Sequence, residues 1–248
     1  MKNNTDRPFA ERYFYSIASI LLLGLTMAGF QLFYFHGQAY PGRPLTPQTK
    51  HLVVIHAVAM SLWMVISVIQ PFLVASGNRR KHMALGRIAA FIAVALVVLG
   101  LLLAIAACKV APPGLMYGAL TPRQFMAVPV LNIVMFALFV AAGVFWRKRT
   151  EIHKPVMFVA TLTAVAAAIS RTDFFNHLYA DTVWEKIFGV FVFSVVIAGL
   201  FFAAKCIVFR RFDFWFAVSC GMMAIGFLII AQIAPTPAWD AIAGFLLK

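Results

Sequence analysis

Seven long apolar stretches interrupt this chain, and the second of them, from Leu52 to Val74, constrains the fold most strongly. At about 1.5 Å per residue, a helix of that length crosses the hydrocarbon core of a bilayer. Its plainly polar residues are His56, Ser61, Ser67 and Gln70. The other stretches lie near 14–35, 88–107, 124–145, 155–170, 187–208 and 214–233. The sequence therefore predicts an all-α polytopic membrane helix bundle with about seven transmembrane helices.

Composition excludes a soluble domain, because 63% of the residues are hydrophobic and only 12% are charged. The net charge of +13 would suggest nucleic acid in a soluble protein. Here 14 of the 21 lysine and arginine residues fall on one side if the N-terminus is cytoplasmic. We therefore expect no nucleic acid but contacts with membrane lipids, in the bacterial cytoplasmic (inner) membrane. A single membrane domain would cover 1–248, with 1–12 in the cytoplasm, a short helix over 237–247 and the C-terminus outside.

One face of the second stretch carries most of its polar residues. His56, Met60, Trp63, Ser67 and Gln70 follow one another at steps of three or four, so they form a single stripe on a helix. The two ends of the stripe are separated by about 21 Å along the helix axis. Polar residues within a membrane mark functional sites or hydrogen-bond neighbouring helices, and the stripe is open to both interpretations.

A weak internal repeat joins stretches two to five. The tetrapeptide that begins at Leu45 returns 75 positions later as Leu-Thr-Pro-Arg, and the basic triplet at Arg79 returns 68 positions later. His82 returns as His153. This pattern predicts a core of spans two to five made of two repeated hairpins, with both histidines at its inner end.

Two motifs in this core carry a resemblance. The sequence His82-x3-Gly86-Arg87 and the sequence His153-Lys-x-x-Met157 are similar to motifs of a group of uncharacterised bacterial seven-span inner-membrane proteins. The resemblance covers roughly 51–172 and implies a fold and site positions, but no activity. That group commonly has Arg-Leu where this chain has Pro155-Val. The layout of histidines on four helices also resembles that of two-haem membrane cytochromes b.

Histidines on facing helices can supply both axial ligands of a haem, and neutral imidazole also binds copper or zinc. An arginine or a polar side chain nearby can hold a haem propionate or a quinone oxygen. We therefore expect the cofactor-binding residues to be His56, His82, His153, Arg171, Trp63, Gln70, Asn132 and Arg87. The remaining histidines are candidate metal ligands near the outer surface, namely His36, His51 and His177. The alternative interpretation is that all these residues are structural. They would then be interfacial side chains or would form hydrogen bonds between helices.

The sequence argues against several classes of protein. The last stretch, 214–233, has no lysine for a retinal Schiff base, and no stretch contains an Asp or Glu for a carboxylate proton relay. The chain has no phosphate-binding glycine loop and no serine hydrolase pattern. Two functions remain open: a redox protein with histidine-ligated haem b or metal, and a non-enzymatic transporter or assembly factor with a polar intramembrane cavity. A quinone or another small hydrophobic molecule would suit either, and no motif decides whether the protein is an enzyme.

Overall fold

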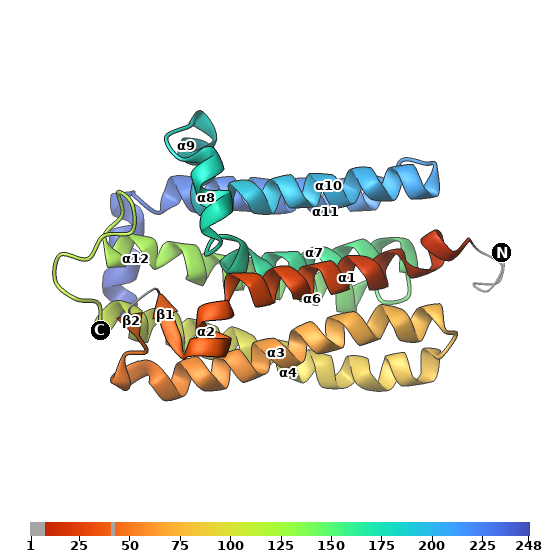
Figure 1. The fold of residues 1–248 in the computed structure, drawn as a ribbon, viewed down its shortest axis with the longest axis horizontal. Helices are drawn as coiled ribbons and strands as arrows, with labels where there is room; N and C mark the ends of the chain where they lie inside the picture. Colours follow the sequence, from red (N-terminus) through yellow and green to blue (C-terminus); the bar gives the residue numbers. More distant parts are fainter. Residues whose placement is uncertain (1–7, 41–42) are drawn as a thin grey trace.

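Long helices that run side by side make up most of the molecule in the computed structural model, which describes residues 8–40 and 43–248 (Figure 1). The long helices are α1 (Phe9–Gly29), α3 (Pro47–Ala75), α4 (Arg79–Lys109), α6 (Ala127–Phe145), α7 (Thr150–Ile169), α10 (Val192–Phe209) and α11 (Phe214–Ile233). The short elements are α2 (Gln31–His36), β1 (Gln38–Tyr40), β2 (Arg43–Pro44), α5 (Pro122–Phe125), α8 (Asp173–Tyr179), α9 (Val183–Phe188), the 3₁₀ helix η2 (Gly189–Phe191) and α12 (Pro237–Leu246). Within the described residues, seven helical segments are long and apolar enough to cross a membrane, so the predicted fold class is confirmed.

The helix at the centre of the bundle is α7. It is not α3, which contains the stretch from Leu52 to Val74 that constrains the fold most strongly in the sequence. In the most apolar part of α7, 72% of the residues are buried, against 17% to 39% in the other six spans. It packs against α1, α6, α10 and α11. One close approach is at Gly29 of α1, where an added Cβ would lie 2.1 Å from the carbonyl oxygen of Ala168. Small residues permit this backbone contact, and lipid is excluded from most of α7.

Spans two to five form the two predicted hairpins. Helices α3 and α4 pack together, as do α6 and α7, and α4 joins the hairpins by packing against α6. The first hairpin turns at Gly77, whose φ of +81° suits glycine. The N-terminal caps of the two repeated hairpins differ. Thr121 forms a full capping box with Gln124, whereas the side chain of Thr46 makes no capping hydrogen bond.

The two ends of the bundle differ in chemistry. One end, called the basic end here, carries the turn from Ser76 to Asn78, the turn from Trp146 to Arg149 and the α10–α11 turn (Figure 1). The opposite end carries α2, the β1–β2 hairpin, α5 and α12. There the buried Trp239 of α12 donates from Nε1 to the carbonyl oxygen of Arg123 at 3.0 Å. This contact anchors the short C-terminal helix, which ends one residue before the predicted limit of 247.

The N-terminal part of the chain departs from its predicted bounds. Helix α1 begins at Phe9, so the predicted segment 1–12 is helical from that residue, and residues 1–7 lie outside the described part. The apolar stretch 14–35 predicts one helix, but α1 ends at Gly29 and α2 begins at Gln31. Phe30 between them has a φ of −109° and a ψ of 19°. Glycine is a poor helix former, and the contact of Gly29 with α7 fixes the break.

Candidate functional site

The basic end holds a pair of facing histidines. His82 and His153 are each the fourth residue of their helix, α4 and α7, and the two helices belong to different hairpins. Their ring centroids lie 6.3 Å apart, with the ring planes at 88°. Two positions separated by 71 residues in the chain are therefore neighbours in space.

The ring of His153 is oriented by the backbone of α6. Its Nδ1 lies 2.7 Å from the carbonyl oxygen of Gly143. Because a carbonyl oxygen only accepts, Nδ1 carries the hydrogen, and Nε2 of the neutral imidazole keeps its lone pair. Gly143 leaves room for Met157, since an added Cβ would lie 2.3 Å from its sulfur and the methionine would have to move. The close approach of α6 and α7 thus fixes this histidine in one tautomer.

The ring of His82 is contacted by Gln70, the last residue of the α3 stripe. The orientation of the Gln70 amide is assigned from two backbone groups of α4, which its nitrogen and its oxygen satisfy together in one orientation only. Its nitrogen donates to the carbonyl oxygen of His82 at 3.2 Å, and its oxygen accepts from the N–H of Gly86 at 2.9 Å. In this orientation the amide nitrogen also donates to Nδ1 of His82. Nδ1 then acts as an acceptor, so the proton of neutral His82 lies on Nε2.

The rest of the stripe faces the interior of the four-helix core. Ser67 and Thr161 of α7 hydrogen-bond through their hydroxyl groups at 3.2 Å. The ring of Trp63 meets Phe136 of α6 edge to face, with centroids 5.0 Å apart. His56 lies against α4, where a Cβ added to Gly100 would be 3.4 Å from its Cε1. The predicted stripe therefore lines a helix interface along its whole length.

Three buried polar atoms along this interface have no hydrogen-bond partner among the described residues. They are Nδ1 of His56, Nε1 of Trp63 and Oδ1 of Asn132. Trp63 is only 2% exposed. The other end of the Asn132 amide donates to the carbonyl oxygen of Thr163 at 3.1 Å. A buried polar group without a partner costs about 1–3 kcal/mol, so these atoms mark positions where a water or a polar ligand group would be stabilising.

The other predicted site residues lie at the surface. Arg171 is exposed at the end of α7, where it donates to the carbonyl oxygen of Ala167 at 2.8 Å and lies 4.9 Å from the ring centre of Phe30. Arg87 is exposed on α4. The three candidate metal ligands are also exposed, on α2, α3 and α8: His36, His51 and His177. Within the described ranges, no group of three or more His, Cys, Asp or Glu side chains could hold a metal ion.

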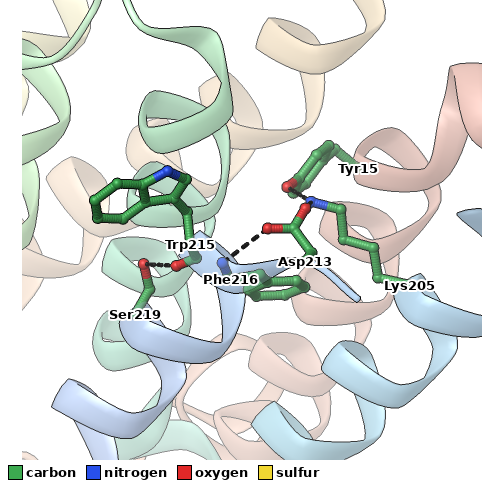
Figure 2. A network of polar contacts seen from close by, with 6 residues as sticks. All are labelled: Tyr15, Lys205, Asp213, Trp215, Phe216 and Ser219. Atoms are coloured by element: carbon green, nitrogen blue, oxygen red, sulfur yellow. Dashed lines mark hydrogen bonds and ion pairs between the residues drawn. The ribbon is translucent and has the colours of Figure 1, made fainter. Parts of the chain in front are cut away.

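Sequence reasoning missed a second polar cluster at the basic end, which Figure 2 shows. Lys205 of α10 is 5% exposed, and its Nζ lies 2.6 Å from Oδ2 of Asp213. The same ammonium donates to the hydroxyl of Tyr15 on α1. Asp213 also caps α11, because its Oδ1 accepts from the N–H of Phe216 at 2.9 Å. The rings of Tyr15, Phe216 and Phe209 surround Nζ at 4.5, 4.9 and 5.6 Å.

The signal for this cluster was present in the sequence. Lys205 is the only charged residue between Val192 and Phe209, and Asp213 is the only acidic residue in the turn that follows. The charge count treats the lysine as a topology signal on the cytoplasmic side. Such a count does not consider whether the side chain is buried. A lone cation in an apolar helix close to a lone carboxylate predicts an ion pair.

Comparisons of the chain with protein-family models, with curated proteins and with solved structures found no match. The fold alone therefore defines the class: a multi-pass integral membrane protein of seven apolar helices whose outer faces contact lipid.

Proposed function

We propose that this chain is a redox protein of the bacterial cytoplasmic membrane in which His82 and His153 ligate one metal centre. The observation that supports it is the pair of facing imidazoles with ring centroids 6.3 Å apart. With metal–nitrogen bonds of about 2.0–2.1 Å, two imidazoles on opposite sides of one metal atom have ring centres roughly 6–6.5 Å apart. The centre would be the iron of haem b or a single copper or zinc ion, and iron or copper would supply one-electron chemistry.

His153 already has the tautomer that a metal ligand needs, whereas His82 does not. The Nδ1–H of His153 is held by the carbonyl oxygen of Gly143, which fixes the ring and leaves Nε2 as the ligand atom. His82 offers its Nε2 only after its proton moves to Nδ1. The resemblance to uncharacterised bacterial seven-span proteins belongs to the same proposal, since its two motifs contain these two histidines.

An absorption spectrum and a metal analysis of the purified protein test the proposal. We expect a Soret band that changes on reduction, or one bound copper, in protein expressed with sufficient haem and metal. His82→Ala and His153→Ala should lose the signal, whereas His177→Ala, which changes an exposed histidine, should keep it. A wild-type protein with neither haem nor stoichiometric copper, including one that binds only zinc, would overturn the redox proposal, as would retention of the signal in both variants.

The unpartnered atoms of His56, Trp63 and Asn132 favour a second candidate function, a transporter or assembly factor that binds a polar group inside the membrane. An oxygen of a quinone or of another small hydrophobic molecule would accept from Nε1 of Trp63, whereas Oδ1 of Asn132 would need a donor such as the hydroxyl of the reduced quinol. We expect decylubiquinone to raise the unfolding temperature of the wild-type protein and to have no effect on His56→Ala. Under this candidate, His56→Ala and Arg171→Ala abolish function while any chromophore or metal at the histidine pair is retained.

The orientation in the membrane is part of the proposal and rests on the charge bias. The excess of basic residues places the N-terminus in the cytoplasm and the C-terminus outside. Single cysteines at positions 79 and 149 should then react with an impermeant thiol reagent from the cytoplasmic side only, and those at 176 and 248 from the outer side only. Labelling of 149 and 176 from the same side would contradict the crossing of α7.

A further inference from the structure

The contact between Gln70 and α4 decides the tautomer of His82. The Gln70 amide meets two backbone groups one helical turn apart, the carbonyl of His82 and the N–H of Gly86. If the amide turned over, its oxygen would face the carbonyl oxygen of His82 and its NH₂ would face the N–H of Gly86. Both contacts would be repulsive, so the backbone of α4 holds the amide in one orientation.

That orientation places an N–H donor against Nδ1 of His82. A donor at Nδ1 stabilises the lone pair there and leaves the proton of the neutral ring on Nε2. His153 has the opposite tautomer, because a carbonyl oxygen faces its Nδ1. The pair is therefore asymmetric, with one Nε2–H and one Nε2 lone pair.

We propose that Gln70 is a positioning residue that controls the entry of a metal between His82 and His153. The inference rests on the proposed function of this pair. Ligation through Nε2 of His82 needs the proton on Nδ1, and Nδ1–H then needs an acceptor. The oxygen of a turned-over Gln70 amide would supply it, at the expense of both backbone contacts. Gln70 therefore weakens the second metal–nitrogen bond and leaves His153 as the first ligand.

The tautomers can be observed without any metal. In metal-free protein labelled with ¹⁵N-histidine, nitrogen–hydrogen couplings should show His82 with its proton on Nε2 and His153 with its proton on Nδ1. Gln70→Glu should move the His82 proton to Nδ1, because a carboxylate only accepts, and should leave His153 unchanged. Ser67→Ala, one turn away on the same face, is the matched control and should change neither ring. A wild-type His82 protonated on Nδ1, or a His82 unaffected by Gln70→Glu, would overturn the inference.

Metal affinity separates this inference from the proposed function. Because a carboxylate that holds a ligating histidine strengthens metal binding about tenfold or more, Gln70→Glu should bind copper ions more tightly than the wild type by that factor. Gln70→Met, which keeps the side-chain length and removes the amide, should fall between them. Equal affinities in all three proteins would contradict the role of Gln70 while the proposed function stands. Absence of any binding to the histidine pair would contradict the proposed function and leave the tautomer assignment to the NMR result.

Discussion

Each of the two polar clusters at the basic end brings together polar side chains from different helices. The clusters differ in how many of their hydrogen-bonding atoms have a partner. In the cluster of Lys205, Asp213 and Tyr15, the ammonium has a carboxylate and a hydroxyl as partners, and the carboxylate also caps α11 (Figure 2). In the histidine pair, each ring has its Nδ1 engaged. Neither Nε2 has a hydrogen-bond partner among the described residues.

This difference separates a structural role from a binding role. A buried ion pair whose two charges are paired with each other joins three helices, α1, α10 and α11, and has a structural role. Nε2 of His153 is oriented by the protein and keeps a lone pair for a metal or a proton, and Nε2 of His82 becomes available once its proton moves to Nδ1. Lys205 is buried and both histidines are half-buried, and the unused bonding capacity of the histidines is the property that points to function.

The largest effect on stability is expected from breaking the ion pair. Lys205→Met leaves the carboxylate of Asp213 buried near aromatic rings without its cation, which should lower the free energy of unfolding by about 3 kcal/mol. The measurement is unfolding in detergent, followed by circular dichroism. Lys205→Met combined with Asp213→Asn should recover much of the loss, since asparagine also caps a helix. Lys186→Met, at an exposed lysine, is the control, and an equal effect there would contradict the structural role of the cluster.

A smaller effect is expected from Tyr15→Phe. This change removes the hydroxyl that accepts from Lys205 and keeps the ring beside the ammonium. A hydrogen bond to a charged group contributes about 1.5–3 kcal/mol, and we expect the lower value because Asp213 stays in place. Tyr13→Phe, two positions earlier on α1, is the matched control in the same unfolding assay. If the two variants unfold alike, the hydroxyl of Tyr15 contributes nothing to the contact between α1 and α10.

Most of the fold could be predicted from the sequence, because apolar length and helix periodicity are local properties. The stretch from Leu52 to Val74 and the stripe on it needed no knowledge of other helices. The central position of α7 could not be predicted in this way. Its apolar stretch is the shortest, and its burial follows from contacts such as that between Gly29 and Ala168, which only the packed bundle shows.

The candidate site could be predicted only in part. The repeat predicted that His82 and His153 occupy equivalent positions, and the structure places their rings 6.3 Å apart with perpendicular planes. The tautomers could not be predicted, because they depend on which backbone groups of α4 and α6 meet Gln70 and His153. The charge count missed Lys205, since a count by side of the membrane carries no information about burial.

The smallest effect on stability, and the sharpest test of the comparison, is expected from His153→Phe. The ring volume is nearly kept, and the one interaction lost is the hydrogen bond to the carbonyl oxygen of Gly143. Since a single hydrogen bond contributes about 0.5–1.5 kcal/mol, the free energy of unfolding should fall by about 1 kcal/mol or less. The same variant should lose all haem or metal at the pair, whereas Tyr15→Phe should lose stability and keep the bound centre. If His153→Phe destabilises the protein as strongly as Lys205→Met does, the histidine pair is a structural contact and the contrast between the two clusters is wrong.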